Sequence, residues 1–556
     1  MRPPGRARLA GRAALYVSSV SRRLHLGGGS VIGGRVGLMI DPELLGVLAR
    51  GRTVALVSGT NGKTTTTRLL AAALGGPSRV ATSTAGANLP SGLVTALIAS
   101  APEAPAVLEV DESYLANVAD AVEPAVVALL NLSRDQLDRV SEVRMVAARW
   151  RAALVGRERT VVVANADDPL VAWAALGAPR VVWVAAGQLW HADAVGCPAC
   201  EGRIVFADGY RDDRNGDSDG DGHVGGDWWC TCGFRRPEPD SWLQGGELVT
   251  SDRCSVPLDL SLPGRCNRAN AAMAAQCASV LGVDIAEALA AMAAVGDVEG
   301  RFATVGHGGG VVRLLLAKNP AGWTELLDLL RERADPAVIG INARVADGHD
   351  PSWLWDVPFE RLAGRLVVAT GERRLDLAVR LRHAGVEHLV VGDQLDALGA
   401  AGSQRADYVG NYTAFQQLRR ALARSARKTS DGLPRLGASV VVRVPAGGAP
   451  QACPTGQRPG WQGDDESAEE PASTVPAGGA PQVPSARSRP GANDGVSALR
   501  VVVVHPDLLG TYGDGGNGRV LADRAAWRGI GVELVMALSD VALPAGADLY
   551  CLGGGE

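Results

Sequence analysis

Residues 54–65 read Val-Ala-Leu-Val-Ser-Gly-Thr-Asn-Gly-Lys-Thr-Thr. The apolar run Val54–Ser58 predicts a short buried strand, and the pattern of Thr66–Leu74 predicts a helix. The glycine-rich turn between them lets backbone N–H groups converge on one point, where the helix N-terminus adds its partial positive charge. A strand, such a turn and a helix in this order are typical of a site that holds phosphate groups.

The residue types in this turn fit that chemistry. In sites of this kind the lysine, here Lys63, reaches the terminal phosphates, and the hydroxyl at Thr64 binds Mg²⁺. The common motif has a glycine where this chain has Val57, so the match is to the shorter form Gly-x-x-Gly-Lys-Thr-Thr. The turn predicts a nucleotide and Mg²⁺ site formed by Gly59, Thr60, Asn61, Gly62, Lys63, Thr64 and Thr65.

Acidic residues follow the next predicted strand, Val107–Val110. In open α/β sheets, ligands bind beyond the carboxyl ends of the strands. Glu109 is therefore a candidate Mg²⁺ ligand, directly or through water. Asp111 and Glu112 are equally consistent with solvated loop charges. The following strand ends in the polar run 131–138, which adds further polar groups to the same edge.

Apolar runs of strand length alternate with helical patterns along two stretches of the chain. Each run is short and is stopped by polar residues, as in strands that are buried on both faces. The alternation predicts an α/β fold whose parallel sheets are covered by helices on both faces. The expected strands are Val126–Leu130, Val161–Ala164 and Val181–Ala185, then Val311–Leu316, Ala337–Ile341, Leu366–Thr370 and Leu389–Val391.

The composition is that of a soluble globular protein. Hydrophobic residues make up 46% of the chain and charged residues 21%, which is ordinary for domains with sizeable cores. The net charge of −5 disfavours a nucleic-acid-binding scaffold. No apolar run approaches the ~18 residues of a membrane span, which argues against an integral membrane protein. Nine cysteines cannot all pair in disulfides, so we expect a reducing compartment, the cytoplasm.

The N-terminal 40 residues carry only positive charge. A signal peptide is excluded because Arg22 and Arg23 interrupt the apolar stretch 13–20. Two interpretations stay open. The segment is either a basic, partly amphipathic element that rests on the anionic inner leaflet of the membrane, or an arginine-rich helix packed on the first domain. No acidic residue precedes Asp41, and the arginines are Arg2, Arg6, Arg8, Arg12, Arg22, Arg23 and Arg35.

Four of the nine cysteines lie in two close pairs, Cys197 with Cys200 and Cys230 with Cys232. Two such pairs, roughly thirty residues apart, can surround one tetrahedral Zn²⁺. The second pair is one residue shorter than usual, so a metal-free insert and a redox pair remain alternatives. Residues 217–222 imitate the start of a calcium loop, but Trp228 stands where that loop needs a glutamate. We expect a solvated hairpin tip there.

The composition changes sharply near residue 440. The octapeptide Val-Pro-Ala-Gly-Gly-Ala-Pro-Gln occurs at 444–451 and again at 475–482, in a region rich in Pro, Gly, Ala and Ser. Such a segment cannot bury enough apolar surface to order itself. We therefore expect a basic N-terminal segment at 1–50, a P-loop domain at 51–304 with a cysteine insert near 190–260, an α/β domain at 305–440, a disordered linker at 441–498, and the start of another α/β domain at 499–556.

The phosphate turn, the Glu109 strand and residues 131–138 together resemble the Mur ligase family, the ATP-dependent amide-bond formers of peptidoglycan synthesis. A closer resemblance, over about residues 8–435, is to the branch that forms the synthetase subunit of lipid II isoglutaminyl synthase. It is carried by Ala-Asn-Leu-Pro-Ser-Gly at 87–92, Arg-Asp-Gln-Leu-Asp-Arg at 134–139, the cysteine insert, Ala-Lys-Asn-Pro-Ala-Gly at 317–322 and Asp-Gly-His-Asp-Pro-Ser-Trp-Leu-Trp-Asp at 347–356.

This resemblance implies a ligase that converts the α-carboxyl of D-glutamate in the lipid II stem peptide to an amide. ATP activates the carboxylate as an acyl phosphate, and ammonia from a glutaminase partner attacks it. Lys63 and Glu109 are implied to be catalytic, and Asp350 or Asp356 to serve the partner's glutaminase centre. The implied ligand sets are Thr64, Thr84 and Glu109 for Mg²⁺, Cys197, Cys200, Cys230 and Cys232 for Zn²⁺, and Asn267, Asn270 and Arg301 near the adenine and the domain hinge.

Residues 509–517 and 552–556 resemble the opening of GatD, a glutamine amidotransferase related to cobyric acid synthase. We expect a fusion whose C-terminal part lies outside this chain, or else a separate GatD-like subunit. Cys551 sits in a strand pattern and is a poor nucleophile candidate. Two other activities stay open: a Mur ligase that adds an amino acid instead of ammonia, and a nucleotide-binding scaffold that only docks an amidotransferase.

Overall fold

The computed structural model describes residues 5–23, 30–83, 87–134, 143–207, 227–296, 302–307, 309–331, 335–430, 442–444, 499–504, 518, 521–522, 524–525, 530–538 and 543–552. The chain divides into two compact units, Met1–Pro454 and Thr455–Glu556. The calcium-like run 217–222, Thr84 and Arg301 lie outside the described residues, as does the predicted linker 441–498 except for residues 442–444, which form a strand instead.

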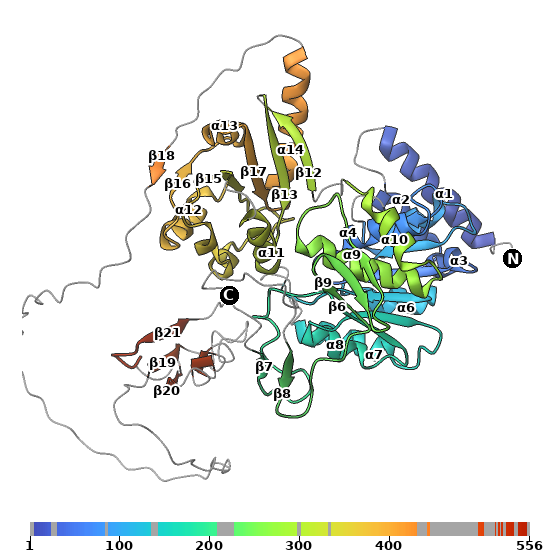
Figure 1. The fold of residues 1–556 in the computed structure, drawn as a ribbon, viewed down its shortest axis with the longest axis horizontal. Helices are drawn as coiled ribbons and strands as arrows, with labels where there is room; N and C mark the ends of the chain where they lie inside the picture. The colour runs from blue at the N-terminus through green and yellow to red at the C-terminus, as the bar shows by residue number, and fades with distance from the viewer. Residues whose placement is uncertain are drawn as a thin grey trace, which may run out of the picture. The chain divides into compact units, whose positions relative to one another are not determined.

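The larger unit begins with a nine-stranded sheet of order β11-β10-β9-β6-β5-β4-β1-β3-β2 (Figure 1). The strands from β2 to β9 in this order run parallel, and β10 and β11 continue the sheet antiparallel. The strands are β1 (Val54–Ser58), β2 (Ala81–Thr82), β3 (Ala106–Glu109), β4 (Val126–Leu129), β5 (Val161–Asn165), β6 (Val181–Ala185), β9 (Ser241–Gln244), β10 (Glu247–Thr250) and β11 (Ser255–Pro257).

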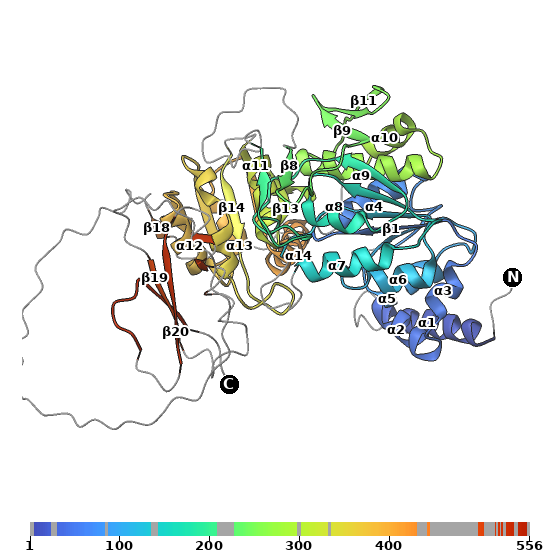
Figure 2. The ribbon, with the colours of Figure 1, turned by 90° about the horizontal axis from the view of Figure 1, so that it is seen from below.

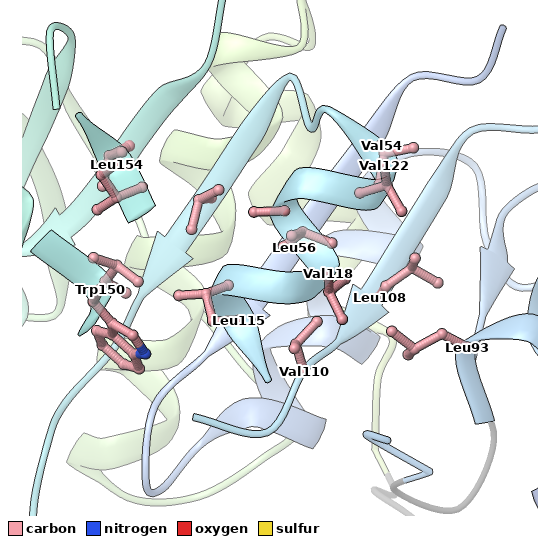
Figure 3. Packing of buried hydrophobic residues seen from close by; sticks show 14 of the residues in the cluster. Val54, Leu56, Leu93, Leu108, Val110, Leu115, Val118, Val122, Trp150 and Leu154 are labelled. Carbon is pink, nitrogen blue, oxygen red and sulfur yellow. The ribbon is translucent and has the colours of Figure 1, made fainter. Parts of the chain in front are cut away.

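Helices cover both faces of this sheet. They are α1 (Gly5–Arg23), α2 (Ser30–Ile40), α3 (Leu44–Ala49), α4 (Lys63–Ala73), α5 (Pro90–Ile98), α6 (Leu115–Val122), α7 (Val143–Leu154), α8 (Pro169–Ala175), α9 (Arg265–Val280) and α10 (Ile285–Ala293). Val54 and Leu56 of β1 pack on the face that α6 and Trp150 of α7 cover (Figure 3). Ala55 and Val57 point to the opposite face, toward α4, α9 and α10. Burial on both faces explains why β1 is continuously apolar in sequence.

Strand β1 lies between β3 and β4 in the sheet. The strands that follow β1 in sequence are therefore added first on one side of it and then on the other. In this register Val57 is opposite Glu109 of β3, and Ser58 is opposite Leu129 of β4. The loops after β1, β3 and β4 therefore leave the sheet side by side, at the kind of switch point where open α/β sheets bind ligands. The predicted strand Val54–Ser58 is confirmed, and α4 begins at Lys63, slightly before the predicted Thr66.

A second sheet of order β12-β13-β17-β14-β15-β16-β18 follows in the same unit. Its central strands β13 to β16 are parallel, and β12 and β18 pair antiparallel at the two edges. The elements are β12 (Phe302–His307), β13 (Gly310–Leu316), α11 (Pro320–Arg331), β14 (Ala337–Gly340), the 3₁₀ helices η1 (Ser352–Asp356) and η2 (Phe359–Leu362), β15 (Val367–Thr370), α12 (Arg374–His383), β16 (His388–Val390), α13 (Gln394–Ala400), β17 (Arg405–Gly410), α14 (Tyr412–Ser430) and β18 (Val442–Val444).

The sequence pattern does not predict β17, because Arg405 and Asp407 interrupt its apolar run. In the structure Asp407 is buried and accepts hydrogen bonds from Arg313 (Nε to Oδ1, 2.7 Å) and Arg365 (2.9 Å to Oδ2). Two guanidinium groups compensate the buried carboxylate. This charge pairing allows a polar strand to occupy the interior of the sheet.

The cysteine insert forms a small antiparallel hairpin of β7 (Ile204–Phe206) and β8 (Trp228–Cys230). The second unit contains β19 (Leu499–Val504), β20 (Val532–Ala537) and β21 (Leu549–Leu552), all parallel, with β19 in the middle. The sequence predicts a single strand–helix–strand element there, but the structure gives β19 a partner on both sides. Within the described parts of the chain, no helix is both long and apolar enough to cross a bilayer.

Candidate active site and cysteine cluster

The turn between β1 and α4 requires glycine at position 62. Gly62 has φ 85°, in the left-handed region that residues with a side chain rarely adopt. A Cβ at this position would also overlap Oδ1 of Asn270 on α9. Conformation and space therefore both exclude other residues, and Asn270 is placed directly against the turn.

Asn131, at the end of β4, holds the turn in shape. Its backbone oxygen accepts a hydrogen bond from the N–H of Thr60 (2.9 Å), and its Oδ1 accepts one from the N–H of Asn61 (2.8 Å). Its Nδ2 donates to the oxygen of Asn61 (3.1 Å). Thr60 is fixed a second time, because its hydroxyl accepts from the N–H of Ser133 (3.0 Å). The polar run after β4 thus preorganises the phosphate turn.

The ammonium group of Lys63 lies inside the turn. It donates to the backbone oxygens of Gly59 and Thr60 and pairs with the carboxylate of Glu112 (2.9 Å). Both side chains are largely buried, with 5% and 14% exposed. Glu112 is therefore the partner of Lys63, and its interpretation as a solvated loop charge is wrong.

Oxygen atoms without partners surround the start of α4. Oγ1 of Thr64, Oε1 of Glu109 and Oγ of Ser133 are buried and make no hydrogen bond with any residue in the described ranges. A buried polar atom left in this state costs ~1–3 kcal/mol. Mg²⁺ prefers oxygen ligands of this kind. The donor set therefore fits Mg²⁺ at the predicted Thr64 and Glu109.

A cavity of about 190 Å³ adjoins the turn. Asn267 and Asn270 of α9 line one side, and β13 and α11 of the second sheet's domain line the other. Asn267 is held there because its Nδ2 donates to the oxygen of Pro263 (2.6 Å). Apolar walls with a few polar groups are typical of small-molecule sites. The other apolar lining residues include Leu262, Met273, Phe302, Leu315, Leu326 and Leu329.

Two polar links join the phosphate turn's domain to the second sheet's domain across this cavity. Asn61 and Asn319 exchange hydrogen bonds between their amides, at 3.2 and 3.3 Å. Arg265 of α9 pairs with Glu325 of α11 at 2.5 Å. Asn319 also caps α11, since its Oδ1 accepts from the N–H of Gly322 (2.9 Å). Asn319 belongs to the sequence motif at 317–322, but that motif does not predict the contact between Asn319 and Asn61.

The two aspartates of the 347–356 motif have different surroundings. Asp350 is exposed, and its two carboxylate oxygens accept hydrogen bonds from the N–H (2.8 Å) and hydroxyl (2.9 Å) of Ser352. Asp356 lies 3.6 Å from the guanidinium of Arg134, which in turn binds Asp193 (2.5 Å). Asp350 is thus fixed within its own loop, whereas Asp356 is tied to the first domain.

The four insert cysteines converge on one point. Their sulfur atoms lie within 4.8 Å of one another, with Cys197 to Cys232 at 3.8 Å and Cys200 to Cys230 at 3.4 Å. Four thiolates ~2.3 Å from a tetrahedral Zn²⁺ are ~3.8 Å apart, so the arrangement fits zinc. The short Cys-x-Cys half is accommodated because Gly233 adopts φ 90° as it turns back to Cys230.

Hydrogen bonds from the chain support the cluster. The N–H of Cys197 donates to the oxygen of Gly202 (2.6 Å), and that of Cys230 donates to Phe234 (2.7 Å). The backbone N–H of Cys232 lowers the pKa of the Cys230 thiol to about 7, whereas burial raises the pKa of the Cys197 thiol to about 12, so Cys230 supplies a thiolate for metal binding more readily than Cys197. Cys254, Cys266, Cys277 and Cys551 lie outside this cluster.

His191 connects the insert to the first domain. Its ring packs against Phe206 of β7, with the ring centroids 4.7 Å apart. Burial, followed by the nearby charge of Arg265, lowers the pKa of His191 to about 3. The imidazole is therefore neutral at physiological pH.

The chain matches two domain families, a Mur ligase middle domain over residues 57–188 and a MurT ligase C-terminal domain over residues 316–415. The MurT subunit of lipid II isoglutaminyl synthase (glutamine-hydrolyzing) from Streptococcus pneumoniae is 29% identical over 444 residues, 75% of this chain and 96% of that protein. The MurT subunit from Staphylococcus aureus strain COL is 27% identical, over 71% of this chain and 93% of its own.

More distant proteins that resemble this chain are also ligases. UDP-N-acetylmuramoylalanine–D-glutamate ligase from Anaeromyxobacter dehalogenans is 30% identical over 55% of this chain and 63% of its own. A pseudomurein peptide ligase type C from Methanothermus fervidus has the same fold, with a TM-score of 0.51 and 19% identity over 67% of this chain and 79% of its own. The chain therefore contains a Mur ligase middle domain and a MurT ligase C-terminal domain, and it is a homologue of the MurT subunits of lipid II isoglutaminyl synthase.

Proposed function

We propose that this chain is the synthetase part of a lipid II isoglutaminyl synthase. It uses ATP to convert the α-carboxyl of D-glutamate in the lipid II stem peptide to an amide. The observation that carries the proposal is the phosphate turn with the unpartnered oxygens of Thr64 and Glu109 beside it, contacted by Asn319 from a MurT-type domain.

The amidation reaction has two steps. A carboxylate oxygen attacks the γ-phosphorus of ATP, which forms an acyl phosphate and releases ADP. Ammonia then attacks the acyl carbon, the bond to phosphate breaks, and the nitrogen loses a proton. Thr64 and Glu109 would hold Mg²⁺, which would neutralise charge during phosphoryl transfer.

The chain's own residues position this reaction. Lys63 provides a fixed positive charge within the turn, where it is neutralised by Glu112 until phosphate arrives. Asn131 keeps the N–H groups of the turn converged. Asn267 and Asn270 supply polar groups to the cavity beside the turn, which would hold the adenine base, and the apolar walls of this cavity limit access of water.

For the nitrogen source we propose a GatD-like glutaminase partner. Of the two candidate aspartates, the contacts favour Asp350 as the carboxylate that orients the partner's histidine. Neutral donors from Ser352 fix its direction and leave its charge uncompensated, as an orienting carboxylate needs. Asp356 is instead engaged by Arg134.

The test for Asp350 separates positioning from folding. With a GatD-like subunit added, Asp350→Asn should lower glutamine-dependent kcat at least tenfold and leave ammonia-dependent turnover unchanged. Asp356→Asn is the matched control and should affect both nitrogen sources alike. Equal loss with glutamine in the two variants contradicts the assignment.

The function itself is tested by product mass. The chain is incubated with ATP, Mg²⁺, lipid II and ammonium ions, and the product is weighed. Conversion of a carboxyl to an amide lowers the mass by about 1 Da. A gain equal to an amino-acid residue would favour the amino-acid-adding alternative, for which the Anaeromyxobacter relative is a precedent. Unchanged substrate would favour a docking scaffold.

We also propose that the cysteine cluster binds one structural Zn²⁺. The sulfur separations support tetrahedral coordination, and no position is left for a substrate. We further propose that the protein is cytoplasmic and works at the cytoplasmic face of the membrane, because its proposed substrate is lipid-linked.

A further inference from the structure

Helix α1 buries small side chains and exposes large apolar ones, which is the reverse of the usual arrangement in a helix on the surface of a globular domain. Its buried positions recur every three or four residues and hold only small side chains. The large apolar side chains of the same helix point away from the protein. The buried residues are Ala7, Ala10, Ala14, Ser18 and Ser21.

The outward face of α1 is an exposed apolar stripe. Leu9 and Tyr16 are 62% and 72% exposed, and Val20 follows one turn later. Residues spaced by seven and four lie on one side of a helix. Helix α2 adds Val31, Ile32 and Met39, the last 82% exposed. Such side chains normally provide the packing energy of a surface helix, so their exposure on both helices calls for a partner.

Close backbone packing holds the two helices in place without these side chains. A Cβ on Gly33 would overlap the hydroxyl of Ser18, and one on Gly37 would lie 3.3 Å from Cβ of Ala14. A Cβ on Gly34 would overlap the backbone of Ser91 in α5. The guanidinium of Arg6 also donates to the oxygen of Ile40 (2.7 Å). The exposed stripe is therefore firmly anchored, and Figure 2 shows α1 and α2 as an outer layer beside α3 and α5.

Only positive charge accompanies the apolar stripe. Arg8, Arg12 and Arg35 are exposed on the same two helices, and no acidic residue precedes Asp41. Arginines interspersed with exposed apolar residues are typical of helices that lie in a membrane interface, because the long side chain keeps its charge among headgroups while its stem is buried. Protein–protein interfaces also favour Arg, Tyr and Met, so the feature that favours a bilayer is the single sign of charge, since no acidic residue precedes Asp41.

We propose that the outer face of α1 and α2, the hairpin face, rests on an anionic bilayer. Leu9, Tyr16 and Met39 enter the boundary between headgroups and acyl chains, and the arginines bind anionic headgroups. No described helix can span the bilayer, so the contact is peripheral. The proposal rests on the proposed function in one respect, since a lipid-linked substrate requires the enzyme to work at that surface.

The experiment measures binding of the full chain to vesicles by flotation. Vesicles of phosphatidylcholine with 30% phosphatidylglycerol are compared with phosphatidylcholine alone. We expect at least tenfold tighter binding to the anionic vesicles, and weaker binding as salt increases. Arg8→Gln with Arg12→Gln should weaken it about 25-fold, from roughly fivefold per arginine. Leu9→Ser with Tyr16→Ser should weaken it at least tenfold.

The matched control is Val155→Ser with Leu176→Ser, two exposed apolar residues elsewhere in the same unit, at 65% and 50% exposure. This variant should bind vesicles like the unaltered chain. Equal binding by the control and the hairpin variants, or no preference for anionic vesicles, overturns the proposal. Concentration-dependent dimers that Leu9→Ser with Tyr16→Ser abolishes, without vesicle binding, would assign the face to a second copy instead.

A separate measurement distinguishes this proposal from the proposed function. Amidation of detergent-solubilised lipid II should be unaffected by Leu9→Ser with Tyr16→Ser, whereas amidation of lipid II in vesicles should fall. Absence of amidation in detergent would refute the function and leave vesicle binding as an independent result. Loss in detergent as well as in vesicles would refute the surface role of the two residues.

Discussion

Replacement of Gly62 by alanine tests whether the phosphate turn depends on its contact with Asn270. The chain offers a matched control in Gly76, whose φ of 86° is almost the same as the 85° of Gly62. A Cβ at Gly76 would have no atom within 4 Å, whereas one at Gly62 would overlap Asn270. The two substitutions share the backbone cost and differ in the steric one.

The left-handed backbone costs an alanine ~1–2 kcal/mol. Gly76→Ala should therefore lower the free energy of unfolding by about that amount. Gly62→Ala adds a steric cost of ~1–3 kcal/mol, as for an overpacked core, for a total of ~2–5 kcal/mol. At ~2–4 °C of melting temperature per kcal/mol, the two variants should be clearly resolved by thermal unfolding.

Calorimetric titration with ATP and Mg²⁺ provides the second readout. Gly62→Ala should weaken nucleotide binding at least tenfold, and Gly76→Ala should not change it. In an Asn270→Ala background the extra unfolding cost of Gly62→Ala should disappear, because the atom that it displaces is gone. Equal stability losses in the two glycine variants, with unchanged nucleotide affinity, would refute the reasoning.

Three other expectations are independent of this one. Lys63→Ala should lower ammonia-dependent amidation at least a hundredfold and also lower the melting temperature, because Glu112 loses its partner, and normal turnover would contradict the assignment of the turn. Cys197→Ser with Cys200→Ser should remove one zinc per chain, by metal analysis, and lower the melting temperature, whereas Cys254→Ser, an exposed cysteine outside the cluster, should do neither. Because the pKa of His191 falls from 6.5 to about 3 on folding, its stabilising neutral form is present above pH 6.5 and is penalised progressively below it. At pH 5 this is ~2 kcal/mol, so His191→Phe should flatten the acid limb of stability measured by urea unfolding, and an unchanged limb would exclude His191 as its source.

The sequence was sufficient to locate the phosphate turn and most parallel strands, because burial on both faces leaves continuous apolar runs such as Val54–Ser58. It could not predict β17, whose Asp407 becomes a strand residue only when Arg313 and Arg365 arrive from elsewhere in the chain. The same limit applies to Glu112. Its role depends on the 2.9 Å contact with Lys63, which no local pattern encodes.

The cysteine pairs show what the spacing of residues in a sequence can and cannot predict. Spacing left zinc, a metal-free insert and a redox pair open, and the convergence of four sulfurs on one point now favours zinc. Asp350 and Asp356 were indistinguishable in sequence because they share one short motif. Their surroundings separate them only in three dimensions, through Ser352 in one case and Arg134 in the other.

The links between the two domains of the larger unit differ in how they respond to ionic strength. The amides of Asn61 and Asn319 carry no charge, so salt leaves that link intact. Arg265 and Glu325 are only 10% and 20% exposed and are weakly screened, whereas Arg134 and Asp356, at 39% and 44%, are screened almost as in free solution. Rising salt therefore loosens the side near the 347–356 motif while the nucleotide side stays closed. Ionic strength should therefore change the position of the 347–356 motif before it changes the nucleotide cavity.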